Sequence, residues 1–179
     1  TLNAEFPDLR ELGRMVNIDL SGSADFDVAM TRIDEIISTR GELKTRGLMI
    51  SSIEAESIDA SWDITDLLNA ADGDFNAQVA ALNAGAVEVN NVDVAATLEE
   101  GLAAINLKAT GQLATDSPWS IDAASRLSVQ DRFAEIQALQ GELDSYRFVL
   151  ESPTRVSFAD EELVLNKCRI ALGDGYLEA

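Results

Sequence analysis

Histidine is absent from the 179 residues, and the chain has one cysteine, three prolines and few aromatic residues (6%). Without imidazole, nucleophiles activated by histidine, histidine metal sites and most general bases at neutral pH are excluded. The single cysteine, Cys168, excludes an intrachain disulfide. No apolar run reaches the length of a membrane span, and no signal-peptide pattern is visible. Because the sequence starts at Thr1 without Met, we expect a fragment of a longer chain.

Positive charge is also scarce. The chain has 13 Lys and Arg against 32 Asp and Glu, a net charge of −19, and residues 47–107 contain no Lys or Arg. Nucleic-acid binding is driven by cations that displace counterions from phosphates. We therefore expect no nucleic-acid partner and little attraction to anionic membrane surfaces. The apolar content of 46% is sufficient for a folded globular chain.

What the sequence does contain is apolar–polar alternation with a period of two residues. In the stretch 58–64, Ile58, Ala60, Trp62 and Ile64 alternate with polar residues, which gives a strand one oily and one acidic face. Similar runs recur to the C-terminus, with turn residues about every 8–12 positions. The pattern predicts an all-β protein built on an elongated, curled antiparallel sheet, a β-taco or groove of about 12 to 14 strands.

Four segments depart from simple alternation. Pro7 and Asp8 favour a short N-terminal helix over Phe6–Met15. Residues 31–43 fit hairpin arms and a short helix equally well, residues 66–71 resemble one helical turn before a turn at 72–74, and residues 130–139 are assigned to a strand. We predict a single segment over 1–179, less regular over 1–46 and made of repeating antiparallel strands over 47–179.

The sequence leaves open whether the oily faces meet. A closed sandwich buries each large aliphatic side chain, at about 1.5–3 kcal/mol apiece, and composition alone favours it. The inward positions, however, are mostly Ala and Val with few aromatics, a narrow lining that suits a channel for acyl chains. Small residues also let two sheets approach closely.

Candidate reactive sites are weak. Alternation places Cys168 with Ile170 and Leu172, away from its basic neighbours, so a core thiol is expected. Asp72, Asp74 and Asn76 resemble the start of a calcium loop, but Ala77 and Asn83 replace its glycine and glutamate. No pair of carboxylates stands out for glycosidase chemistry, and the two tryptophans alternate in phase with aliphatic residues. We predict no enzyme activity, no metal and no cofactor.

The C-terminal third carries a recognisable pattern. It reads L-Q-G-E-L over 139–143, Y-R-F-V-L-E-S-P over 146–153 and C-R-I-A-L-G-D-G-Y-L over 168–177, with looser matches at 20–26 and 107–119. This resembles the TamB branch of the AsmA-like periplasmic proteins, the translocation and assembly module family of bridge-like lipid transfer proteins. The helix-like segment 31–43 departs from the family pattern, and the membrane anchor and the partner-docking part of the family lie outside this chain.

The resemblance implies a hydrophobic conduit in the periplasm, anchored in the inner membrane of a diderm bacterium and working with an outer-membrane barrel of the TamA type. Its implied role is phospholipid transport between the two membranes and assembly of outer-membrane proteins, and its implied ligands are phospholipid acyl chains or hydrophobic strands. The alternative is a self-contained β-sandwich that recognises glycan or protein. The predicted groove lining is Ile58, Trp62, Ile64, Val79, Val87, Val89, Val92, Val94, Leu98, Ile105, Leu107, Trp119, Ile121, Phe148, Leu150, Val156, Leu163, Leu165, Ile170 and Leu172.

Overall fold

The computed structural model describes residues 1–159 and 162–178, which form one short helix and fourteen strands. The elements are β1 (Leu2–Phe6), α1 (Arg10–Val16), β2 (Leu20–Ile33), β3 (Ile36–Ile50), β4 (Ile53–Thr65), β5 (Asp72–Ala84), β6 (Val87–Glu99), β7 (Leu102–Leu113), β8 (Pro118–Ser128), β9 (Phe133–Leu143), β10 (Tyr146–Leu150), β11 (Thr154–Ala159), β12 (Glu162–Leu165), β13 (Arg169–Leu172) and β14 (Gly175–Glu178).

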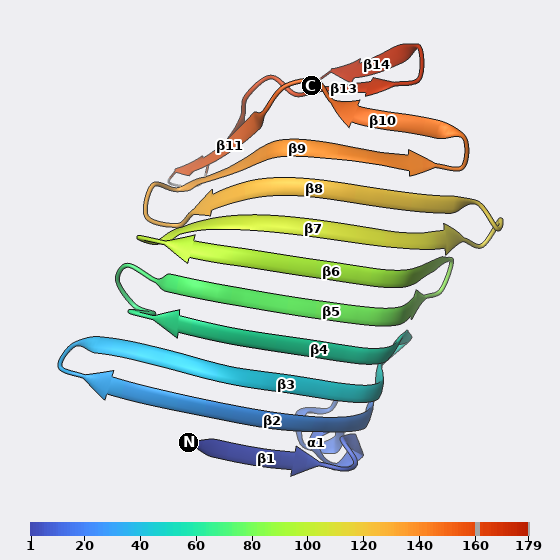
Figure 1. Ribbon diagram of the computed structural model, residues 1–179. Helices are drawn as coiled ribbons and strands as arrows, with labels where there is room; N and C mark the ends of the chain where they lie inside the picture. The colour runs from blue at the N-terminus through green and yellow to red at the C-terminus, as the bar shows by residue number, and fades with distance from the viewer. Residues whose placement is uncertain (160–161, 179) are drawn as a thin grey trace.

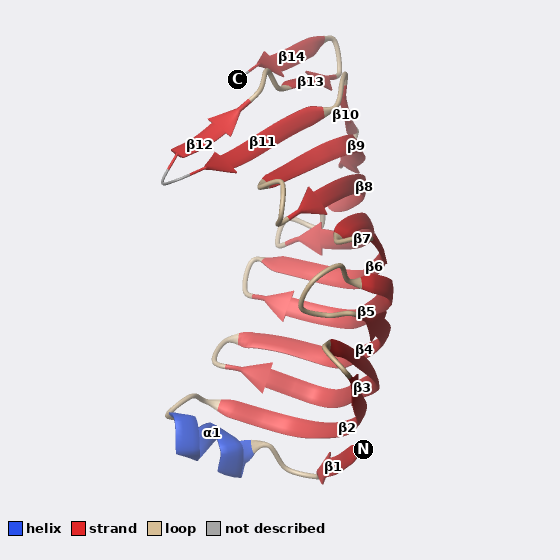
Figure 2. Ribbon diagram, turned by 90° about the vertical axis from the view of Figure 1, so that its left-hand side faces the viewer, coloured by secondary structure: helices blue, strands red, loops and turns tan. Residues whose placement is uncertain are grey.

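All fourteen strands belong to one antiparallel sheet that does not close on itself. From β1 to β10 each strand pairs with the next one in the chain, so the sheet is a simple meander (Figure 1). Strands β2 to β9 are 11–15 residues long, about twice the usual length. Seen from the side, the strands bend in one sense and the sheet becomes a curved wall with a concave and a convex face (Figure 2). The predicted curled antiparallel sheet is confirmed.

The sheet divides after β9. The right-hand half of β9 pairs with β10, and its left-hand half pairs with β11, because the chain leaves the ladder at residues 151–153 (Figure 1). Two short branches follow, β11–β12 and β10–β13–β14. Arg169 links the branch point to β13, with its Nε 3.0 Å from Glu151 Oε2 and its guanidinium 4.0 Å from the Tyr176 ring.

The N-terminal helix is shorter than predicted. It covers Arg10–Val16, and Phe6 belongs to β1, a strand that alternation over five residues was too short to reveal. Asp8 starts the helix by accepting hydrogen bonds from the Arg10 backbone N–H and guanidinium, and these hold the pKa of Asp8 at about 2. Asn17, in the left-handed conformation with φ 56°, ends it. The helix packs on β2 through Gly13 and Leu20.

The other three ambiguous segments also became clear. Residues 31–43 are hairpin arms of β2 and β3, joined by a turn at 34–35. Residues 66–71 form a loop whose turn is closed by Asn69 N–H donating to Asp66 O, not a helical turn. The predicted turn at 72–74 is the first part of β5. Residues 133–143 form β9, so the strand assignment holds for 133–139, whereas residues 130–132 lie in the turn before it.

Three glycines that look like turn signals lie inside strands. Gly41, Gly111 and Gly141 each face an aromatic side chain of the neighbouring strand: Trp62, Trp119 and Phe148 respectively. A Cβ at Gly41 would lie 2.6 Å from Trp62 Cζ2, so only glycine leaves room for the ring to lie flat on the sheet. In these three positions glycine therefore indicates close packing of an aromatic ring on the strand, and not the end of a strand.

A line of irregular residues crosses four strands. Four residues that lie opposite one another have no partner in the strand pairing: Gly47 on β3, Glu56 on β4, Ala81 on β5 and Asn90 on β6. On β6 this is a β-bulge, because Val89 pairs with Gly111 and Asn91 with Thr110. A bulge adds one residue and bends its strand. The runs 87–89 and 92–98, which alternate in opposite phase, therefore form one strand with one apolar face.

The protein exposes a large surface. Its accessible area is 11,887 Å², whereas a compact monomer of 19.3 kDa is expected to expose about 8,500 Å². Among the described residues, five hydrophobic side chains are buried: Leu9, Ala24, Ala55, Ala109 and Leu150. Among the described residues there is no second layer over the apolar face, so the closed sandwich is not the fold of this chain. The seven-residue helix α1 is too short to span a membrane.

Candidate functional site: an apolar trough

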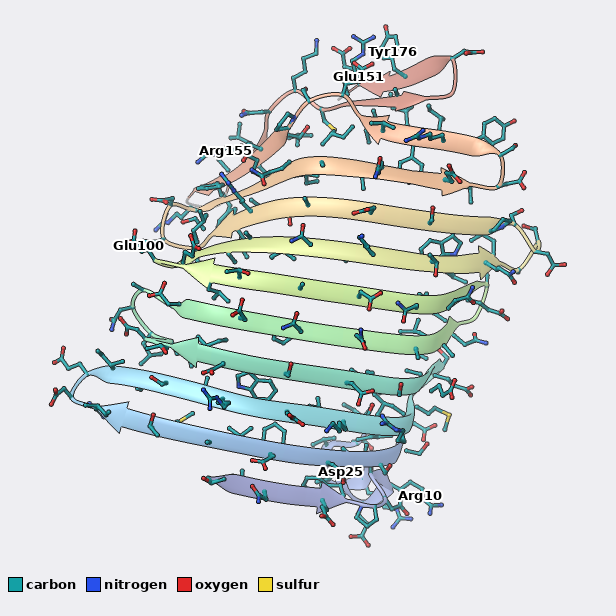
Figure 3. The ribbon with its side chains drawn as sticks, viewed as in Figure 1. Arg10, Asp25, Glu100, Glu151, Arg155 and Tyr176 are labelled. Carbon is teal, nitrogen blue, oxygen red and sulfur yellow. The ribbon has the colours of Figure 1, made fainter. Side chains whose placement is uncertain are left out.

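The concave face of the sheet, called the trough from here on, collects the apolar half of every long strand. Residues paired across an antiparallel ladder point to the same face, so the register decides which side chains share it. Ile58 is opposite Val79, which is opposite Val92, while their neighbours Asp59, Gln78 and Asp93 pair on the convex face. Figure 3 views the convex face, where oxygen-tipped side chains stand on the ribbons.

Four rows of side chains run along the trough, at right angles to the strands. They contain no charged residue in the strands that the structure describes. The central rows are Phe6, Ala24, Thr45, Ile58, Val79, Val92, Ala109, Ile121, Gly141, Phe148 and Leu172; Ala4, Phe26, Leu43, Ala60, Ala77, Val94, Leu107, Ala123 and Leu139; Leu2, Val28, Gly41, Trp62, Phe75, Ala96, Ile105, Ser125, Ile136 and Thr154; and Met30, Thr39, Ile64, Gly73, Leu98, Ala103, Leu127, Ala134, Val156 and Leu165.

The structure brings the predicted lining residues together on this face. Most lie in the four central rows. Val87, Val89 and Trp119 lie on the same face beyond the bulge, and Leu150 and Ile170 pair with each other on the β10–β13 branch. The side chain of Leu163 lies outside the described residues. Leu165 and Leu172, at the branch ends, are 50% and 41% exposed, and most of the others are half-buried.

Sequence reasoning missed several lining residues. Leu43 and Leu139 lie in segments where helical spacing competed with alternation, and the pairing shows both in the trough. Phe26 and Phe75 also belong to the lining, with the Phe26 and Trp62 ring centroids 6.1 Å apart across Gly41 on β3. The alternating pattern contained the signal for both phenylalanines.

The four central rows contain four hydroxyl side chains, Thr39, Thr45, Ser125 and Thr154, and the three threonines are hydrogen-bonded within the protein. Thr39 Oγ1 accepts a hydrogen bond from Trp62 Nε1 at 3.1 Å. Thr45 Oγ1 accepts one from the Ile58 backbone N–H at 3.0 Å, and Thr154 Oγ1 donates to Ser152 O. A ligand lying on these rows therefore meets mainly hydrocarbon and aromatic surface.

The convex face has the opposite chemistry. One row across eight strands alternates acids with hydrogen-bond donors, in the order Asp25, Lys44, Asp59, Gln78, Asp93, Lys108, Asp122 and Gln140. Gln78 Nε2 donates to Asp93 at 3.0 Å, and Lys108 Nζ lies 3.9 Å from Asp122. Glu42, 2.8 Å from Lys44 Nζ, raises the pKa of that lysine. These pairings favour the observed strand register, and the charged side chains keep the convex face solvated.

The weaker candidate sites lie apart from the trough rows. Asp72, Asp74 and Asn76 are successive outward residues of β5, an extended strand, and not a calcium-binding loop. Cys168 is a free, half-buried thiol in the connection before β13. Within the described residues no three acidic or cysteine side chains are grouped as a metal site requires.

The two rims of the trough are formed by the turns. One rim, called the acidic rim, consists of the turns after β2, β4, β6 and β8, and it carries Asp34, Glu35, Asp66, Asp72, Glu99, Glu100 and Asp131 beside Arg32 and Arg132. Its turns touch one another, because Leu67 N–H donates to Ile37 O and Gly101 N–H to Ala71 O. Apolar side chains also project from it: Ile33, Leu68 and Val129 are 70–72% exposed. Glu100 marks this rim in Figure 3.

Together these features define an open, single-sheet β-trough with an apolar concave face and a polar convex face. Comparison of the chain with protein-family models, with curated proteins and with solved structures gives no match. The resemblance to the TamB-like family therefore stays a prediction that depends on sequence motifs.

Proposed function

We propose that the trough is a non-enzymatic conduit that shelters hydrocarbon, with the acyl chains of phospholipids as its ligand. The observation that carries the proposal is the set of four central rows, which cross up to eleven strands without a charge. An exposed apolar surface of this size is uncommon in monomeric proteins and marks an interaction site. A sandwich that binds glycan or protein needs two facing sheets, and the described strands form only one.

The dimensions agree with this ligand. Nine inter-strand steps separate β1 from β10, and at about 4.8 Å per step the trough is roughly 43 Å long. One bilayer leaflet contributes about 15 Å of hydrocarbon, so a phospholipid tail fits along the trough with room for others. Each methylene that leaves water contributes about 0.8 kcal/mol. The sheet has this apolar surface ready without any further folding step.

The uniform chemistry of the central rows would let an acyl chain move along the trough. Because no central-row residue offers a charge and three of the four hydroxyl side chains in the rows are bonded internally, neighbouring positions along the trough should have similar energies. Headgroups would stay at the open side, in water. The motif resemblance supports a place in the periplasm, between the inner membrane and an outer-membrane barrel of the TamA type, where the protein would move phospholipids and aid outer-membrane protein assembly.

The test uses the two tryptophans, Trp62 and Trp119, which both lie in the trough and are the only ones in the chain. The purified protein is analysed for bound lipid by native mass spectrometry and then mixed with lipids brominated on the acyl chain. We expect co-purified phospholipid and quenching of tryptophan fluorescence by more than half. Absence of both lipid and quenching contradicts the proposal.

A matched pair of variants on β6 locates the ligand. Val94→Asp places a carboxylate in the trough, and Ala95→Asp places the same group on the convex face one residue away. Because the trough is open, each carboxylate reaches water and both variants should fold. We expect Val94→Asp to reduce lipid retention at least tenfold and Ala95→Asp to leave it unchanged. Equal loss in both variants, or none in either, overturns the assignment of the ligand to the trough.

A further inference from the structure

The charge of the rims limits which lipids the trough accepts, and this inference rests on the proposed function. The central rows are free of charge, so a bound phospholipid keeps its headgroup at the open side of the trough, which the two rims border. The seven carboxylates of the acidic rim outnumber its two guanidinium groups, one of which, Arg32, donates to the backbone carbonyl of Asp34. The rim carboxylates act by repulsion and hold no ligand.

The spacing of the rim makes the repulsion continuous. Turns on one rim follow every second strand, so they are about 9.6 Å apart. The Debye length is about 8 Å at physiological ionic strength, so a headgroup that lies beside this rim feels at least one rim carboxylate at every position along it. Local hydrogen bonds, such as the one from the Glu100 backbone N–H to Asp72 at 2.8 Å, leave the negative charge in place.

The opposite rim gives no compensation. Its turns, at residues 51–52, 85–86, 114–117 and 144–145, contain Asp116 and Asp144 and no lysine or arginine. Two cations near the start of this rim are paired with carboxylates: Arg46 on β3 lies 3.2 Å from Asp59, and Arg10 in α1 lies 2.6 Å from Asp8. From this distribution we infer that the trough selects phospholipids with zwitterionic headgroups and disfavours those with a net negative headgroup.

The experiment offers both classes at once. The full chain is incubated with vesicles of equal parts phosphatidylcholine and phosphatidylglycerol with identical acyl chains, and the lipid it extracts is quantified by mass spectrometry. In 0.1 M salt, where the Debye length is about 10 Å, we expect at least fivefold enrichment of phosphatidylcholine. In 1 M salt, where it is about 3 Å, the enrichment should fall below twofold.

Two variants with equal change in net charge separate the rim from the whole molecule. The triple variant Glu35→Gln, Glu99→Gln, Glu100→Gln neutralises rim carboxylates. The control Glu5→Gln, Asp25→Asn, Glu142→Gln neutralises three exposed convex-face carboxylates, and Figure 3 labels Asp25. We expect the rim variant to reduce the enrichment about twofold or more and the control to leave it unchanged.

Each other result has a distinct meaning. Equal extraction of both lipids by the wild-type chain, or equal effects of the two triple variants, overturns the selectivity and leaves the conduit standing. Extraction of neither lipid overturns the conduit and the selectivity together. Enrichment of phosphatidylglycerol would show that an attraction outweighs the rim, and it also overturns the inference.

Discussion

Val94 and Ala95 are neighbours on β6, yet they belong to two surfaces with different chemistry. Val94 lies opposite Ala77 and Leu107 in the trough, and Ala95 lies opposite Asn76 and Asn106 on the convex face. The difference extends along the whole sheet: the trough has an uncharged lining, and the convex face carries charges and amides. The stability of the sheet and the proposed activity therefore depend on keeping each residue on its own face.

Deleting Asn90 should break this separation and have the largest effect. The bulge at Asn90 lets both Val89 and Val92 face the trough. Without it, Val87 and Val89 would turn outward and Glu88 inward, because a one-residue slip exchanges the faces of a strand. We expect about 3 kcal/mol of destabilisation from lost apolar burial, measured by urea unfolding.

The matched control is Asn90→Ala, which keeps the residue count. This variant should change the free energy of unfolding by less than about 0.5 kcal/mol, since Asn90 is exposed. If deletion and substitution cost the same, the bulge does not maintain the two faces.

Adding one methyl group to the trough should have the second largest effect. In Gly111→Ala the new Cβ would overlap Glu88 O and lie 2.6 Å from Trp119 Cζ2. We expect about 2 kcal/mol of destabilisation, as for other overpacked sites, together with a changed Trp119 fluorescence spectrum. Gly175→Ala is the control, because its Cβ would meet Leu172 O at an ordinary 3.6 Å. An unchanged melting temperature for Gly111→Ala would show that the indole does not lie on the sheet.

Removing a charge from the convex face should have the smallest effect. Lys108 and Asp122 are exposed, with nitrogen and oxygen 3.9 Å apart. Exposed pairs of this kind contribute about 0–1 kcal/mol. We expect Lys108→Gln to change stability by less than about 0.5 kcal/mol and lipid retention not at all. A large loss of either would mean that the convex row takes part in function.

The comparison of the two faces also explains what could be read from the sequence. Strict alternation, as in Ile58–Ile64, has no other interpretation, and the pairing confirms it residue by residue. Helical spacing over 31–43 and 130–139 was a true ambiguity, because short apolar runs satisfy both periods. Tertiary pairing with β4 and β8 resolved it in favour of strands.

Glycine was the main source of error in the boundaries. Gly73, in the predicted turn at 72–74, lies inside β5, where its missing side chain makes space for the backbone carbonyl of Asp63, and Gly111 on β7 makes space in the same way for the Trp119 indole. The local sequence does not distinguish a glycine in a turn from a glycine that makes space inside a sheet, since the group that fills the space belongs to another strand. The short helix was misplaced for a related reason: β1 exists because β2 offers it a free edge.

The alternation of apolar and polar residues, by itself, determined that this chain forms a two-faced antiparallel sheet, because the side-chain period of a strand is two. The tertiary structure alone decided that the apolar face stays uncovered. Whether two such faces meet depends on how far each strand bends, and the bending depends on contacts between strands, such as the bulge on β6, the unpaired residues aligned across β3 to β6 and the rings lying over glycines. Those contacts join residues that are distant in the chain, so no local pattern specifies them.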